Sequence, residues 1–272
     1  MTHRSSNNLI NSSDNRLSVQ IALTGLSFLI TNRSSTELIH FSEKKFQQPR
    51  TPEELLLEID TFFADEFAGT PQFESVSVIY SNIEYTVVPS PLFNPDKASD
   101  YLKFNSKILL DDFIAYDELK ERDLVVVYVP YVNINNYLFE RFGSFRYYHM
   151  ASMLLKKLDS RQKYSDEPEV FIHVADNSFD LLIQKKGELQ LCNSYHFTTA
   201  EDFIYYILFA FEQLKVNPDK AEVKLLGNIE QQDSLHSIAY TYIRNISFYD
   251  TTSERIEIPD NPSHRQLLLK SL

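Results

Sequence analysis

One strand–turn–strand pattern occurs twice in this chain, and that repeat restricts the fold more than any single motif does. Residues 170–183 (VFIHVADNSFDLLI) indicate a buried strand, a tight polar turn and a second strand. Residues 17–30 (LSVQIALTGLSFLI) arrange their apolar residues in the same way around a Thr-Gly turn. We therefore predict a duplicated fold with one distinctive hairpin in each half.

The two halves also match in the order of their predicted elements. Each hairpin is followed by a third strand, by a helix that begins at a Thr-x-Glu sequence, and by another strand. Threonine is a favourable N-cap, and acidic residues are stabilised near a helix N-terminus. The spacing is 153 residues between Leu17 and Val170 and 148 residues between Thr51 and Thr199, because the second copy has shorter turns. A repeat of this length predicts a domain duplication rather than a solenoid.

The remaining patterns divide the chain into domains. We predict a disordered leader at 1–16, a first domain at 17–158, a linker at 159–169, and a second domain at 170–272 that ends in a polar tail. Outside the hairpins, strands are predicted at 37–41, 76–80, 85–88, 108–115, 124–129, 188–192, 221–226 and 246–249. Helices are predicted from 51 to about 69, at 94–104, 133–142 and 147–158, from 198 to about 217, and at 233–244, with charged residues 117–122 as a turn. The strand at 124–129 is apolar on both faces and is expected to be central in its sheet.

Composition and charge exclude several classes of protein. The net charge of −12 argues against nucleic acid or an anionic membrane surface as the main partner. A single cysteine, Cys192, excludes an intrachain disulfide and is expected to be a buried apolar thiol. The N-terminus lacks the apolar core of a signal peptide, and the longest apolar run is far shorter than the roughly 20 residues that cross a bilayer. We therefore expect a cytoplasmic protein without direct membrane insertion.

The chain is poor in glycine, which restricts the ligands that its loops can hold. It contains 5 glycines in 272 residues, far below the usual share of about 7%. Loops that cradle phosphate usually need several glycines, because the backbone N–H groups must approach the ligand closely. The patterns G-x-G-x-x-G, G-x-x-x-x-G-K-[ST], G-x-S-x-G and H-E-x-x-H are all absent.

Two β-β-β-α-β domains, one with Asp176 in its first turn, resemble the superfamily of actin, the heat-shock chaperone ATPases and the sugar kinases. The resemblance covers about residues 17–250. It is closest to a degenerate bacterial branch typified by the actin-like assembly proteins of type IV pili and type II secretion, and it extends to an uncharacterised bacterial family of about this length. It implies an α/β fold of duplicated ribonuclease-H-like domains that face each other across a cleft for ATP and Mg²⁺.

The resemblance places the candidate site on the two hairpins. In the superfamily each phosphate hairpin has an aspartate, which holds the metal and its waters, followed by glycines that let backbone N–H groups reach phosphate. In the first half Leu23 stands at the position of the aspartate, followed by Thr24-Gly25. In the second half Asp176 is present, but Asn177-Ser178 follow it in place of glycine. Each half thus keeps a different fragment of the site.

The adenosine-binding turn of the superfamily, a strand followed by Gly-Gly and a helix, is reduced here to Leu226-Gly227-Asn228. Asp176 is the candidate metal ligand, and the candidate cofactor-binding residues are Thr24, Gly25, Asp176, Asn177, Ser178, Gly227 and Asn228. The structural alternative for all of them is an ordinary turn, in which Asp caps backbone N–H groups and Gly takes a positive φ. We expect His173 to be a hydrogen-bonded core or cleft residue and Asp180 to be a solvated strand residue.

Two functions from different classes follow from these residues. The loss of the acid in one hairpin and of the glycines in the other favours a pseudoenzyme, a scaffold or adaptor that binds another protein. The alternative is a divergent ATPase or kinase, in which Asp176 holds the metal and Gly25 and Gly227 contact Mg-nucleotide. A third possibility is that another small molecule binds in the same cleft.

Overall fold

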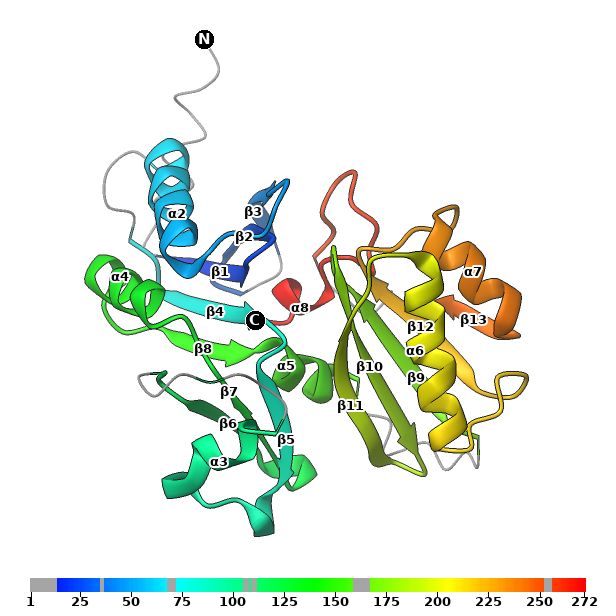
Figure 1. The fold of residues 1–272 in the computed structure, drawn as a ribbon. Coiled ribbons are helices and arrows are strands. Elements are labelled where there is room, and N and C mark those ends of the chain that lie inside the picture. Colours follow the sequence, from blue (N-terminus) through cyan, green and yellow to red (C-terminus); the bar gives the residue numbers. More distant parts are fainter. Residues whose placement is uncertain are drawn as a thin grey trace. The chain divides into compact units, whose positions relative to one another are not determined.

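The computed structural model describes the chain in seven stretches, at residues 14–34, 37–67, 72–104, 108, 112–158, 167–251 and 256–272 (Figure 1). Most of the predicted leader, the predicted end of the first helix near residue 69, and most of the predicted linker lie outside these residues. The chain divides into two compact units. The first comprises Met1–Met153, Glu254–Pro259 and Leu268–Leu272, and the second comprises Leu154–Ser253 and Asp260–Leu267.

The first unit is built on a five-stranded sheet with the order β3-β2-β1-β4-β8. Its strands are β1 (Asn15–Ala22), β2 (Gly25–Asn32), β3 (Leu38–Lys45), β4 (Ser75–Ser81) and β8 (Arg146–His149). The first three strands form an antiparallel meander, and β4 and β8 continue the sheet in parallel with β1. Asn15 and Arg16, which the sequence analysis assigned to the leader, already belong to β1, because they pair with Asn32 and Thr31 of β2.

Two helices of this unit pack against each other, α2 (Pro52–Glu66) and α4 (Val132–Phe142). Helix α2 begins after Thr51 because the Thr51 hydroxyl accepts the N–H of Glu54, while the Glu54 carboxylate accepts the N–H of Thr51. The apolar residues of α2 recur at helical spacing, and Phe62 and Phe63 pack on the ring of Phe28 in the sheet.

The second unit repeats this architecture. Its sheet has the order β11-β10-β9-β12-β13, with the same strand directions as the first sheet. Its elements are β9 (Glu169–Val174), β10 (Ser178–Lys185), β11 (Glu188–His196), α6 (Ala200–Gln213), β12 (Glu222–Gly227), α7 (Ser234–Tyr242) and β13 (Asn245–Phe248). Helix α6 begins with a second capping box, formed by Thr199 and Asp202. The shared topology and the shared cap confirm the predicted duplication. In each half the capping acid lies one residue beyond the acid of the Thr-x-Glu sequence.

An insertion between β4 and α4 distinguishes the first unit from the second (Figure 1). It contains β5 (Tyr85–Pro89), α3 (Ala98–Leu102), β6 (Ala115–Leu119) and β7 (Leu124–Tyr128). These strands form a separate sheet with the order β5-β7-β6, so the apolar run at 124–129 is central, as predicted. The predicted turn at 117–122 is wrong in its first residues, which belong to β6. Charged Asp117 is accommodated in this strand because its carboxylate accepts hydrogen bonds from the His149 N–H and the Ser152 hydroxyl.

The helix predicted at 147–158 begins later than expected. Residues up to His149 form β8, and α5 (Met150–Lys157) starts only after it. The segment is extended because it pairs in parallel with β4, where Tyr147 lies opposite Val78. A tertiary partner about seventy residues away in the chain thus overrides the local helical pattern.

The end of the chain contributes to the first unit. A small apolar cluster joins Leu29 of β2 to Ile258 and to Leu269, which belongs to the short helix α8 (Leu267–Lys270). The sequence pattern predicted one domain over all of 170–272, whereas Ile258 and Leu269 pack in the first unit. No helix within the described stretches is long and apolar enough to span a membrane.

Candidate functional site

The first hairpin turns through Leu23 and Thr24, because Ala22 of β1 pairs directly with Gly25 of β2. Both turn carbonyls are engaged by the connection that follows β3. The N–H of Arg50 donates to the Leu23 carbonyl (2.8 Å), and the N–H of Phe46 donates to the Thr24 carbonyl (2.9 Å). The hairpin turn is therefore tied to the segment that leads into α2.

Gly25 lies in β2 and not in the turn itself. A Cβ atom at this position would lie 2.8 Å from the backbone oxygen of Lys44 in β3. The glycine is thus explained by the close approach of two strands. The alternative prediction that Gly25 is an ordinary turn residue is therefore wrong. The pairing of β2 with β3 explains why a glycine is needed at this position.

The second hairpin turns through Asp176 and Asn177, and the N–H of Ala175 donates to the Ser178 carbonyl (2.8 Å). The Asn177 carbonyl accepts the N–H of Phe197 (3.1 Å), just as the Thr24 carbonyl accepts that of Phe46. The duplication therefore extends to individual backbone hydrogen bonds. The Asp176 side chain is exposed, and its Oδ1 accepts a hydrogen bond from Nδ2 of Asn228 (2.5 Å).

Gly227 forms the turn that follows β12. Its φ is +85°, and a Cβ atom here would lie 2.3 Å from the carbonyl oxygen of Val174. That oxygen also accepts the N–H of Asn228 (2.7 Å). The predicted positive φ is confirmed, and the close approach to β9 is a second reason why only glycine fits.

His264 covers this turn from a segment that the sequence analysis described only as a polar tail. The Gly227 N–H donates to the His264 carbonyl (3.0 Å), and His264 Nε2 lies 2.8 Å from the Ile229 carbonyl. Because a carbonyl can only accept, Nε2 carries the hydrogen. The imidazole stacks on Phe248, with ring centroids 4.3 Å apart, and His264 is buried. No local signal in the sequence links His264 to Gly227.

A buried polar group lies on β9, β10 and β11. Asp180 is only 2% exposed, so its predicted solvation is wrong. The charge is tolerated because Oδ2 lies 3.2 Å from His173 Nδ1, while Oδ1 accepts the hydroxyl of Ser194. His173 is buried and hydrogen-bonded as predicted, and Cys192 is buried. Since the Ser194 hydroxyl donates to the aspartate, this group does not form the base–nucleophile contact of a hydrolase triad.

The predicted residues fall into two groups. Thr24 and Gly25 belong to the first unit, whereas Asp176, Asn177, Ser178, Gly227 and Asn228 belong to the second. In the second group Asp176 and Asn228 are brought into direct contact. Over the ranges that the structure describes, no three His, Cys, Asp or Glu side chains are grouped so as to hold a metal ion. The residues present do not fit a magnesium nucleotide, because Leu23 offers no side-chain oxygen and the turn at Gly227 is covered by His264.

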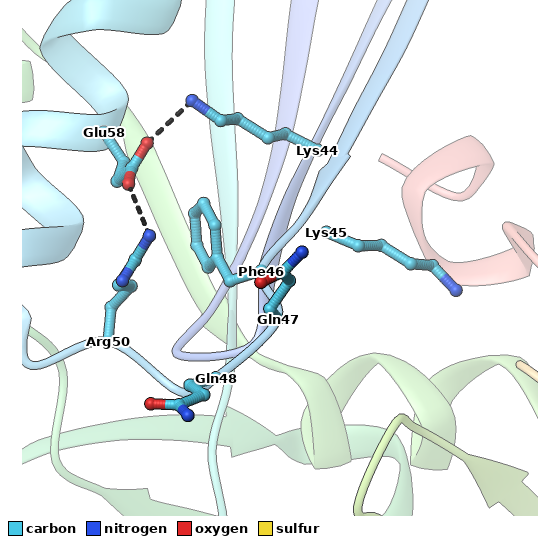
Figure 2. Close-up of a pocket in the computed structure, with 7 residues that line it drawn as sticks. All are labelled: Lys44, Lys45, Phe46, Gln47, Gln48, Arg50 and Glu58. Carbon is cyan, nitrogen blue, oxygen red and sulfur yellow. Dashed lines mark hydrogen bonds and ion pairs between the residues drawn. The ribbon is translucent and has the colours of Figure 1, made fainter.

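A pocket of about 310 Å³ opens beside the first hairpin, on the segment that follows β3 (Figure 2). It is lined by Lys44, Lys45, Phe46, Gln47, Gln48, Arg50 and Glu58. Glu58 of α2 bridges two cations, with Oε2 2.7 Å from Lys44 Nζ and Oε1 3.1 Å from Arg50 Nη2. The Lys44 hydrogen bond, together with both positive charges, lowers the pKa of Glu58 below its ordinary value. No sequence motif predicted this pocket.

Comparisons with known proteins agree with the fold. A family model described as "Protein of unknown function (DUF3822)" matches residues 4–246. The structure of a Bacteroides thetaiotaomicron protein with an actin-like ATPase fold and unknown function is 19% identical, with a TM-score of 0.72, and the match covers 90% of this chain and 93% of that one. A search of curated proteins finds no match.

Two further solved structures are similar. One is the PilM-PilN type IV pilus biogenesis complex, which is 11% identical with a TM-score of 0.52 over 87% of this chain and 88% of that one. The other is the ethanolamine utilization protein EutJ from Carboxydothermus hydrogenoformans, which is 6% identical with a TM-score of 0.51 over 94% and 88%. The predicted actin-like fold of duplicated ribonuclease-H-like domains is confirmed. At these identities the likeness establishes the fold alone.

Proposed function

Because this chain belongs to the DUF3822 family of proteins of unknown function and has an actin-like fold, we propose that it is a non-enzymatic scaffold or adaptor that binds another protein. The observation that carries the proposal is the contact between His264 and the turn at Gly227. The superfamily that this chain resembles uses the corresponding turn for adenosine. In this chain the polar backbone groups of the turn already have partners.

The energetic consequence can be estimated from these contacts. A ligand at this turn would have to displace two hydrogen bonds of about 1 kcal/mol each and one ring stack of about 0.5–1.5 kcal/mol. The sum, about 3 kcal/mol, weakens binding by a factor of roughly 100. Leu23 adds to the loss, because a leucine cannot orient a metal ion or its waters.

Support for a protein partner comes from outside the two hairpins. One structure with this fold is a complex of two proteins, PilM and PilN. In this chain α6 and α7 carry exposed aromatic side chains, namely Tyr205, Phe209 and Tyr240. Exposed aromatic residues are enriched in protein interfaces, since they bury much apolar area with few rotatable bonds.

A divergent ATPase or kinase is the second candidate, and one observation favours it. Asp176 keeps the acid at the second hairpin, and its side chain is exposed beside Asn228. In this alternative Asp176 holds the metal ion, and Gly25 and Gly227 contact the nucleotide. It requires that the segment with His264 leaves the turn when nucleotide binds.

Calorimetric titration of the full chain with Mg-ATP separates the two functions. The scaffold proposal expects no saturable heat below about 1 mM ligand, and no ATP hydrolysis above the buffer rate. Micromolar affinity would refute it. If ATP is hydrolysed, Asp176→Ala decides the alternative, because that variant must lose hydrolysis while its circular dichroism and melting temperature stay those of the parent.

The adaptor role needs a separate measurement in cells. Affinity purification of the parent and of Asp176→Ala is expected to recover the same partner protein in equal yield, because the proposed interaction uses no nucleotide. A partner that is recovered only with the parent, and only in the presence of ATP, contradicts the non-enzymatic proposal.

A further inference from the structure

The pocket beside the first hairpin concentrates positive charge in a chain whose net charge is −12. Three of its seven lining residues are cationic and one is acidic, so its formal charge is +2. A local excess of positive charge attracts anions even though the chain as a whole is acidic.

The cations are held in place by one carboxylate. Figure 2 shows Glu58 between Lys44 and Arg50, each of its oxygens directed at a different cation. One carboxylate thus serves two positive groups, whereas the side chain of Lys45, which also lines the pocket, points away from Glu58. Glu58 Oε1 therefore already occupies the Nη2 group of Arg50.

Arg50 has unused capacity for a second acceptor. Only its Nη2 contacts Glu58, and its buried Nε has no hydrogen-bond partner. Nε and Nη2 together form the fork that binds two oxygens of one carboxylate or phosphate. The guanidinium also stacks over Phe46, 5.3 Å from the ring centroid, and this contact fixes the plane of the fork.

We propose that this pocket binds a small organic molecule through a carboxylate or phosphate group. The oxyanion of the ligand accepts hydrogen bonds from Nε and Nη2 of Arg50, and the Glu58 side chain rotates away from Arg50. The body of the ligand lies on the ring of Phe46, within reach of the side-chain amides of Gln47 and Gln48. The volume of about 310 Å³ is at the lower end of the range of ligand pockets, about 300–1,000 Å³, so the ligand is small.

The site is independent of the proposed scaffold function, because it uses neither Asp176 nor Gly227. The probes are inorganic phosphate and citrate, titrated separately into the full chain at constant ionic strength and without magnesium or nucleotide. Calorimetry is expected to give saturable binding of at least one probe, with a Kd below about 1 mM. The tighter probe identifies the oxyanion as a phosphate or a carboxylate.

Three variants test the geometry. Arg50→Lys keeps the charge and removes the fork, and is expected to weaken binding about tenfold. Glu58→Gln removes the competing carboxylate and is expected to tighten binding about fivefold. Lys120→Met is the matched control, since Lys120 is exposed in the insertion, and it should leave the affinity unchanged.

The effect of the probes on the melting temperature of Glu58→Gln separates a binding site from a structural ion-pair cluster. If the cluster only stabilises the fold, Glu58→Gln lowers the melting temperature and neither probe restores it. If the proposal is right, the probe raises the melting temperature of Glu58→Gln by more than it raises the melting temperature of the parent. Absence of saturation by either probe below about 10 mM overturns the proposal, as does equal weakening in Lys120→Met.

Discussion

Replacing Gly227 with alanine is expected to destabilise the second unit by about 3–6 kcal/mol. A residue with a Cβ at φ +85° costs about 1–2 kcal/mol in backbone strain. The Cβ would lie 2.3 Å from the Val174 carbonyl, so β9 and β12 must separate locally, at the roughly 1–3 kcal/mol of an overpacked site. The shift also breaks the hydrogen bond from Asn228 to that carbonyl, worth about 1 kcal/mol.

Two other glycines supply controls that separate these contributions. Gly143 has a φ of +72°, and a Cβ there would meet no atom within 4 Å, so Gly143→Ala tests the backbone contribution alone, about 1–2 kcal/mol. Gly25 does not have a positive φ, but its Cβ would lie 2.8 Å from a backbone oxygen, so Gly25→Ala tests the steric contribution alone, about 1–3 kcal/mol.

Urea unfolding followed by far-ultraviolet circular dichroism measures all three variants against the parent. We expect Gly227→Ala to lower the free energy of unfolding by clearly more than either control variant does. If Gly227→Ala costs no more than Gly143→Ala, the close approach of the turn to β9 is not a constraint, and the assignment of Gly227 as a packing residue is wrong. If Gly227→Ala is too unstable for urea unfolding, native-state hydrogen exchange of β12 against the parent gives the same comparison.

Two further predictions concern the helix caps and the pocket. Thr51→Ala and Thr199→Ala are each expected to lower the free energy of unfolding by about 1 kcal/mol in urea, because each removes one of two equivalent capping boxes, and a loss in only one variant would contradict that equivalence. The folded-state pKa of Glu58 is lowered, so its ion pairs stabilise the fold above its ordinary pKa of 4.5 and cease to do so as the pH falls through the folded-state value. The free energy of unfolding of Glu58→Gln should therefore lie below that of the parent at pH 7, by about 1 kcal/mol or less, and the two should converge as the pH falls below the folded-state pKa of Glu58.

Those parts of the fold that depend on neighbouring residues were predictable from the sequence. The two hairpins, the helix starts at Thr51 and Thr199, and the central strand at 124–129 all carry local signals of apolar period or capping. The parts that depend on distant partners were not predictable. Strand β8 is extended only because β4 lies beside it, and Asp117 is accepted in β6 only because His149 and Ser152 donate to it.

At the candidate site, too, features with a local sequence signal were predictable and features that depend on distant partners were not. The positive φ of Gly227 follows from its place after a strand, whereas its contact with His264 joins residues 37 positions apart that share no motif. Asp180 was predicted to be a solvated strand residue, yet it is buried between His173 and Ser194. Burial of a charge depends on its partners, and these come from two other strands.

The cluster of Leu29, Ile258 and Leu269 has a consequence for the order of events during protein synthesis. Leu269 follows Leu29 by 240 residues. A ribosome that adds about 5–20 residues per second therefore needs roughly 12–48 s to supply the last side chain of this cluster. The first unit cannot finish packing while it emerges, and the second unit is complete in the chain before it. A nascent chain arrested before Ile258 should thus leave Leu29 of β2 exposed to chaperones and proteases, whereas synthesis past Leu269 allows the cluster to close.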